Sequence, residues 1–356
     1  LRLDAVHAII DNSAKQFIEE LTEAVHRAAD SADRRVHIIA ESAANDSRLL
    51  RDCEHGGVGM DGQWNDDFHH ALHAMLTGER QGYYRAFGHV EQLEKSMREG
   101  FVYTGEYSPF YRRRHGRPSA DLRPDRFVVF SQNHDQVGNR AAGDRLAASV
   151  SFEASKLAAG LVFLSPYVPM LFMGEQYMDP APFLYFASHS DRTLIHAVRK
   201  GRRREFADFE WDRQPPDPFA QETFEQSRLD WSLREREPHC TMLKFYKELI
   251  RVRREVLALH NAQRDDVTVD CDPGCKILTV QVRSGDRDGL ILFNCSGQSH
   301  SIRPDIAQRD WTRELDSSAA HWNGPGETAP ERLTAPKRPN FSMTPHSVAV
   351  YTCGDE

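Results

Sequence analysis

The chain has 356 residues, 40% of them hydrophobic and 28% charged, which is enough apolar material to build a core and excludes wholesale disorder. Its 45 Lys and Arg against 53 Asp and Glu give a formal net charge of -8. General nucleic-acid binding depends on neutralising phosphates, so this charge argues against it, and it also does not suit an anionic membrane surface. The length predicts one large domain and a smaller one, or two of similar size.

Residues 157–173 are the most apolar stretch, but Gly160, Pro166 and Pro169 interrupt it, which predicts a helix end and a strand instead of a membrane span. The six cysteines are scattered and lack the paired spacing of a metal site. Cys271 and Cys275 could bridge across a turn, but reduced thiols are favoured. No secretory signal opens the sequence, so we expect a cytoplasmic protein.

Apolar runs alternate with one-faced helical patterns over the first 258 residues. The runs that predict strands are residues 1–3, 36–40, 63–65, 127–130 and 168–172. The helical patterns cover residues 15–29, 67–76, 90–97, 153–163 and 241–257. A charged insert follows residue 175 and extends to about residue 237. The alternation predicts an α/β architecture, with a parallel sheet covered by helices.

From about residue 259 the pattern changes to short strands separated by Gly, Asp, Asn and Pro turns. These strands are predicted at residues 267–269, 276–282, 289–293, 300–302 and 347–352. Such a pattern is typical of an antiparallel sandwich or barrel. We therefore predict two domains, residues 1–258 and residues 259–356.

Asp4, Glu41 and Asp135 share one kind of position, just beyond the C-terminal end of a predicted parallel strand. Active sites of parallel α/β proteins lie at that end. Converging carboxyl groups repel, so one of them should hold a proton near neutrality. One ionised and one protonated carboxyl flanking a bond is the arrangement for glycoside hydrolysis. A single acid after a strand is more often a helix cap or a loop residue, so the structural alternative stays open.

Two further patterns have both functional and structural interpretations. Arg2 and Asp4 lie two residues apart on one strand and face the same side, so Arg2 could keep Asp4 ionised, or the two could form a plain ion pair. His69 and His73 have the i, i+4 spacing of zinc sites, but the Glu of H-E-x-x-H is absent and no third ligand is evident. Sugar contact or packing is favoured, and we expect no cofactor or metal.

Three motifs in this order resemble those of the α-amylase superfamily of glycoside hydrolases. They are Leu1–His7 for the nucleophile, Ile38–Glu41 for the acid/base and Phe130–Gln136 for the third carboxylate. The resemblance implies a (β/α)₈ TIM barrel followed by an all-β antiparallel sandwich domain. It further implies Asp4 as nucleophile, Glu41 as general acid/base and Asp135 as transition-state stabiliser.

Within the superfamily, Gly62–His73, Gln132–Arg140 and Leu171–Glu175 resemble the enzymes that release trehalose from maltooligosyltrehalose. That resemblance implies hydrolysis of the α-1,4-glucosidic bond next to the trehalose end, with retention of configuration. The implied substrate-binding residues are Arg2, His7, Trp64, Asp66, Asp67, Phe68, His69, His70, Asn133 and His134.

The first three barrel strands of the family have no counterpart here, so the five predicted strands would be the fourth to the eighth of the barrel. We therefore expect a fragment, about the C-terminal three-fifths of such an enzyme, that is inactive alone. The alternatives are a related α-glucan enzyme, such as a branching enzyme or amylase, and a non-catalytic fragment that at most binds glucan. The expected partner is an oligosaccharide, with no nucleic acid and no membrane.

Overall fold

A parallel sheet of five strands forms the N-terminal part of the computed structural model, which describes residues 1–205, 215–284, 287–306, 309–335 and 339–354. The strands lie side by side in chain order, and every neighbouring pair is parallel. They are β1 (Arg2–Leu3), β2 (Ile39–Ala40), β3 (Gly62–Trp64), β6 (Phe127–Val129) and β7 (Val168–Pro169). The predicted parallel sheet is confirmed, with strands shorter than the apolar runs.

Helices cover this sheet, and the five predicted ones are all present. The helices are α1 (Phe17–Ser31), α2 (Asp66–Thr77), α3 (Val90–Glu99), α4 (His134–Gly138), α5 (Leu146–Ser149), α6 (Phe152–Phe163), α7 (Arg192–Glu205), α8 (Gln221–Gln226) and α9 (His239–Arg251). The charged insert contains α7 and α8, which no apolar pattern predicted, and its residues 206–214 lie outside the described residues. Within the described ranges, no helix has both the length and the apolarity needed to span a membrane.

The C-terminal part is an antiparallel sheet of six strands in the order β13-β12-β15-β10-β9-β8. Its strands are β8 (Val267–Asp272), β9 (Ile277–Ser284), β10 (Arg287–Asn294), β12 (Trp311–Asp316), β13 (Arg332–Leu333) and β15 (Ser347–Gly354). Two small antiparallel sheets of two strands each pair β11 (His300–Ile302) with β14 (Phe341–Met343) and β4 (Tyr107–Ser108) with β5 (Arg113–Arg114). The predicted antiparallel β-rich part is confirmed.

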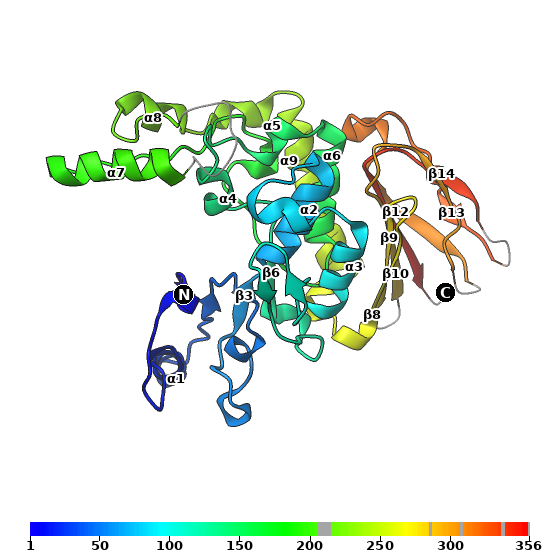
Figure 1. Cartoon of the computed structure of the whole chain (residues 1–356). Coiled ribbons are helices and arrows are strands. Elements are labelled where there is room, and N and C mark those ends of the chain that lie inside the picture. The colour runs from blue at the N-terminus through cyan, green and yellow to red at the C-terminus, as the bar shows by residue number, and fades with distance from the viewer. Residues whose placement is uncertain (206–214, 285–286, 307–308, 336–338, 355–356) are drawn as a thin grey trace.

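One hydrophobic core is shared by the helices and the antiparallel sheet. In Figure 1, α3, α6 and α9 lie between the parallel strands and the antiparallel sheet. Leu157 of α6 and Phe245 of α9 belong to the same buried cluster as Val280 and Val348 of the antiparallel sheet. The domain boundary after residue 258 therefore stays a prediction, because the core is continuous across it.

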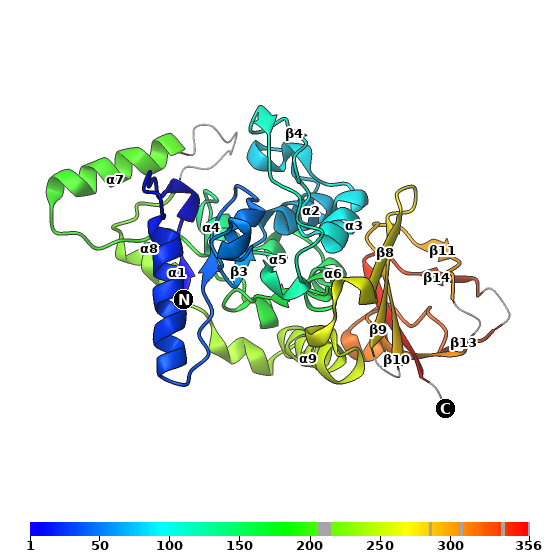
Figure 2. The same cartoon turned by 90° about the horizontal axis from the view of Figure 1, so that it is seen from below.

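The parallel sheet has two open edges, at β1 and at β7. Within the described part of the chain, each of these strands pairs with one neighbour only. Large apolar side chains are exposed near both edges: Leu1 is 60% exposed, Ile10 87%, and Leu171 39%. Seen from below, α1 and the N-terminus lie at the β1 edge, away from the antiparallel sheet (Figure 2).

Candidate active site

Asp4 and Glu41 lie side by side at the C-terminal edge of the parallel sheet. Leu3 is opposite Ala40 in the register of β1 and β2, so the next residue on each strand is one of the two acids. The backbone N–H of Glu41 donates to the carbonyl of Leu3 over 2.9 Å, and the N–H of Val6 donates to the carbonyl of Glu41 over 3.1 Å. These bonds fix the backbones of both acids to each other.

The turn after Asp4 depends on Glu41 as well. Ala5 has a φ of 44°, in the left-handed region that a residue with a Cβ seldom adopts. Its backbone N–H donates to the Glu41 carboxylate, which offsets the cost of this conformation. The Asp4 side chain is 78% exposed. A strained turn held by a candidate catalytic group is typical of a functional site.

Asp135 is the second residue of α4, directly after the loop that follows β6. Asn133 caps α4: its Oδ1 accepts from the N–H of Asp135 over 2.8 Å and also from the N–H of Gln136. In turn, the side-chain Oε1 of Gln136 accepts from the backbone N–H of Asn133 over 2.9 Å. The Asp135 side chain is 47% exposed, with its Oδ1 3.5 Å from Nε2 of His134. Asn133 is thus a buried cap, and His134 and Asp135 face the open side.

Asp66 and its neighbour Asp67 are carboxyls whose pKa burial raises at this edge, that of Asp67 to about 6. Asp66 begins α2 and accepts a hydrogen bond from the side chain of Gln136 over 3.2 Å. Burial, followed by repulsion from Glu41, Asp67 and Asp135, raises the pKa of Asp66 to about 7. The repulsion places Asp66 near both Glu41 and Asp135, so four acids gather here. The sequence analysis assigned Asp66 to substrate binding and did not single it out as the proton holder.

Arg2 contacts both Asp4 and Trp64. Its Nη1 lies 2.7 Å from the Asp4 carboxylate, and its guanidinium lies 4.2 Å from the centroid of the Trp64 ring. Trp64 is buried, and its ring also meets those of Phe130 and His134 edge-on, with centroids 5.7 and 5.9 Å away. Trp64 therefore supports Arg2 and His134 from beneath in this structure, and does not offer an open face to a sugar.

Most of the predicted trehalose-side segment is buried in structural contacts. Phe68 is fully buried in the core. One oxygen of Asp67 accepts from the side chain of Asn45 and from the N–H groups of Val102 and Tyr103, at 2.7 to 2.9 Å. The full burial of Phe68 corrects the expectation that it faces the substrate. Asp67 is held by the protein interior but also lines a small cavity, so its contact with substrate stays a prediction.

His69 is neutral and fully engaged by protein groups. Its Nδ1 donates to the carbonyl of Ser131 over 2.7 Å, and the Tyr84 hydroxyl donates to its Nε2 over 2.8 Å. Burial lowers the pKa of His69 well below its ordinary value. His73, its neighbour one turn along α2, lies 2.9 Å from the Glu79 carboxylate. The rings of both His69 and His73 thus have protein partners. Both ring nitrogens of His69 are occupied, which corrects the expectation that it contacts the substrate.

A small aromatic cavity lies beside Asp66. It has a volume of about 10 Å³ and is lined by Asp66, Asp67, His70, Tyr83, Phe87, Tyr103 and Tyr111, among others. Of the predicted substrate residues in the segment, Asp66, Asp67 and His70 line it. The aromatic residues were missed because they lie on irregular segments, where no periodic pattern marks them. His7, in contrast, lies exposed in the turn after Ala5.

The fold is that of the α-amylase class. A crystal structure from Salmonella typhimurium, provisionally described as an alpha amylase, is 34% identical and matches with a TM-score of 0.82, covering 99% of this chain and 56% of that chain. The crystal structure of an alpha-amylase from H. orenii matches with a TM-score of 0.57 at 14% identity, covering 99% of this chain and 60% of that one. This second likeness shows the fold alone.

By sequence, the chain is a relative of the malto-oligosyltrehalose trehalohydrolases, as its motifs predicted. The protein of that name from Saccharolobus solfataricus is 49% identical over 254 residues, which are 71% of this chain and 42% of that protein. The one from Rhizobium sp. (strain M-11) is 42% identical over 317 residues, 87% of this chain and 53% of that protein. No family model matches the chain. The chain spans about half the length of the curated relatives it matches.

Proposed function

We propose that this chain supplies the catalytic carboxylates of a retaining glycoside hydrolase that cleaves the α-1,4-glucosidic bond next to the trehalose end of maltooligosyltrehalose. The observation that carries the proposal is the convergence of Asp4, Glu41 and Asp135 at one sheet edge, in a chain 49% identical to a named trehalohydrolase. Two carboxyl groups on adjacent parallel strands can flank one glycosidic bond.

In the proposed mechanism, Asp4 attacks the anomeric carbon while Glu41 protonates the leaving oxygen. Arg2 keeps Asp4 ionised through its 2.7 Å ion pair. Glu41 then removes a proton from the water that hydrolyses the glycosyl-enzyme ester, so configuration is retained. Asp135 and His134, both facing the open side, stabilise the sugar in the transition state.

For the trehalose unit we propose contacts with Asp66 and His70 at the mouth of the aromatic cavity, which at about 10 Å³ is itself too small to hold a sugar ring. Sugar hydroxyls need several donors and acceptors of fixed geometry, and aromatic rings offer apolar faces to sugar C–H groups. Asp66, with a pKa of about 7, can donate as well as accept a hydrogen bond near neutral pH. His7, exposed after the Ala5 turn, is proposed to contact the glucan side.

We also propose that β1, β2, β3, β6 and β7 are the fourth to eighth strands of a (β/α)₈ barrel, and that the ring closes with strands contributed by an N-terminal part. The open edges at β1 and β7 and their exposed apolar side chains support this. The greater length of the relatives supports it too. The six free thiols favour a reducing, cytoplasmic compartment.

The test uses what we call the completed enzyme: this chain co-expressed with the N-terminal part that its Saccharolobus solfataricus relative has beyond the aligned residues. Incubation with maltooligosyltrehalose should release free trehalose, measured by chromatography, and NMR should show the new reducing end in the α configuration. A soluble completed enzyme that shortens plain maltooligosaccharides equally well would favour an amylase. One that only binds glucan would favour the non-catalytic alternative.

A further inference from the structure

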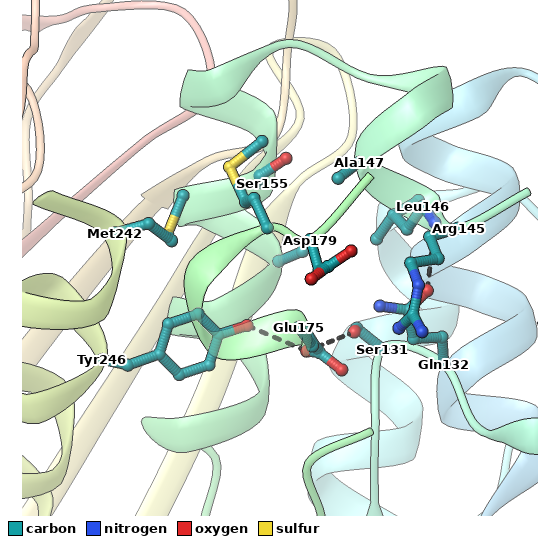
Figure 3. A pocket seen from close by; sticks show the side chains of 12 residues that line it. Ser131, Gln132, Arg145, Leu146, Ala147, Ser155, Glu175, Asp179, Met242 and Tyr246 are labelled. Carbon is teal, nitrogen blue, oxygen red and sulfur yellow. Dashed lines mark hydrogen bonds between the residues drawn. The ribbon is translucent and has the colours of Figure 1, made fainter. Parts of the chain in front are cut away.

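Glu175 is the centre of a buried hydrogen-bond network beneath the candidate active site (Figure 3). Its Oε1 accepts from the Ser131 hydroxyl over 2.7 Å and from the Tyr246 hydroxyl over 2.9 Å. Its Oε2 accepts from the backbone N–H of Phe172 over 3.2 Å. These donors belong to the β6–α4 loop, to α9 and to the segment after β7. One carboxyl group therefore ties together three elements that are distant in the sequence.

The loop that Glu175 binds leads from β6 into α4, the helix that carries Asp135. Ser131 is held from two sides, because its carbonyl accepts from His69 while its hydroxyl donates to Glu175. The next residue, Gln132, accepts from the N–H of Leu146 over 3.0 Å. Ser131 and Gln132 are buried, whereas Asp135, four residues after Ser131, is half exposed. The half-exposed Asp135 thus follows a buried segment, Ser131 and Gln132, that a hydrogen bond to Glu175 holds in place.

Glu175 is half-buried and has little open space beside it. The cavity between Glu175, Ser131, Arg145 and Asp179 has a volume of about 20 Å³, which is room for about one water molecule and too little for a sugar ring. Burial raises the pKa of the Glu175 carboxyl, and hydrogen bonds led by those of Ser131 and Tyr246 counteract this. Any influence of Glu175 on the reaction must therefore pass through the groups it binds.

We propose that Glu175 is a positioning residue, which holds Asp135 in register with Asp4 and Glu41 through the hydroxyl of Ser131. This inference rests on the proposed function for its kinetic consequence, although its structural consequence can be measured without it. A carboxylate that acts in the transition state must be held to within about 0.5 Å, so release of this buried segment should reduce turnover without abolishing the fold.

Ser131→Ala and Tyr246→Phe form a matched pair, because each removes one hydroxyl from the same oxygen of Glu175. In the completed enzyme, Ser131→Ala should lower kcat about tenfold or more with KM changed less than about twofold. Both variants should lower Tm by similar amounts, because each removes one hydrogen bond to Glu175. Tyr246→Phe, however, should keep kcat within about twofold of the wild-type value. Glu175→Gln, which keeps an oxygen for Ser131, should retain more kcat than Glu175→Ala. Equal kcat losses in both hydroxyl variants, or none in either, would overturn the proposal.

The structural arm uses the completed enzyme with ¹⁵N label in the 356-residue chain only, and it needs no activity. In two-dimensional ¹H–¹⁵N NMR spectra, Ser131→Ala should shift the amide signals of Asn133 to Asp135, and Tyr246→Phe should leave them in place. If the completed wild-type enzyme releases no trehalose, the proposed function fails, and these shifts alone still decide the positioning role. Unshifted Asp135 and Asn133 signals in Ser131→Ala, with the remaining spectrum folded, would refute it.

Discussion

The Glu41 carboxylate accepts a hydrogen bond from the backbone N–H of Ala5, the residue that follows Asp4. The proposed acid/base therefore also shapes the turn that presents the proposed nucleophile. Any substitution at Glu41 consequently tests two things, the proton that the side chain delivers and the geometry of Asp4. Glu41→Gln separates them, because the amide oxygen can still accept from Ala5 while the group no longer titrates.

In the completed enzyme, Glu41→Gln and Asp4→Asn should each lower kcat at least about 10³-fold with little change in Tm. The measurement is trehalose release under saturating maltooligosyltrehalose, with thermal unfolding as the control. Glu41→Ala should also lower Tm, because Ala5 would keep its left-handed conformation without the hydrogen bond that its N–H donates to Glu41. A carboxyl separation near 9 Å between Asp4 and Glu41 in a crystal structure would contradict retention, which requires about 5–5.5 Å.

Asp66 should make stability depend on pH. The pKa of Asp66 in the folded state, about 7, lies above the ordinary Asp value of 3.8. Between these pH values the folded state therefore holds a proton that the unfolded state has lost. This contribution is full below about pH 4 and is lost as pH rises to about 7, with a slope of up to about 1.4 kcal/mol per pH unit. Urea unfolding of Asp66→Asn should show a flatter pH dependence than the wild-type chain. Identical slopes would show that Asp66 ionises normally.

Asp66 and its neighbour Asp67 should respond differently to alanine. Asp67→Ala leaves the donors of Asn45, Val102 and Tyr103 without their acceptor, so the free energy of unfolding should fall by about 3 kcal/mol or more. Asp66→Ala should unfold nearly like wild type below about pH 4, where the carboxyl is protonated in both states. In the completed enzyme it should raise cleavage of plain maltooligosaccharide relative to the trehalose-capped substrate. An unchanged substrate ratio would assign Asp66 to packing.

The 356-residue chain by itself should release no measurable trehalose. β1 carries Arg2 and Asp4 and pairs only with β2 in the described part of the chain, so the nucleophile stands on an open edge. The exposed Leu1 and Ile10 near that edge should also promote aggregation, measurable by light scattering. Turnover by the purified chain near that of the completed enzyme would show that the open sheet is rigid enough for catalysis.

Elements with strong periodicity could be predicted from the sequence, while those that depend on distant partners could not. The buried run at residues 127–130 and the amphipathic α3 were predicted because local pattern and tertiary structure agree. The strand β12, Trp311–Asp316, was missed because its alternate residues are polar and it becomes a central strand only through pairing with β15. The helix α7 was missed because basic residues dominate it.

The site shows the same division. The acids Asp4, Glu41 and Asp135 follow strands whose ends could be predicted, so their shared edge was foreseeable. The burial of Asp67, Phe68 and His69 was not, since in one sequence a run of polar and aromatic residues at a helix start is compatible with sugar binding and with packing alike. The raised pKa of Asp66 depends on burial and on acids distant in the sequence, Glu41 after β2 and Asp135 in α4.

Lys156 of α6 is fully buried, 3.0 Å from the Glu153 carboxylate, and donates to the carbonyls of Ser317 and Trp322 beside the antiparallel sheet. A buried cation cannot be left without acceptors at small cost. A protease cut near residue 258 should therefore leave the two parts attached under native conditions. Swapping the C-terminal part between relatives should succeed only when the incoming part places backbone carbonyls where those of Ser317 and Trp322 accept from Lys156.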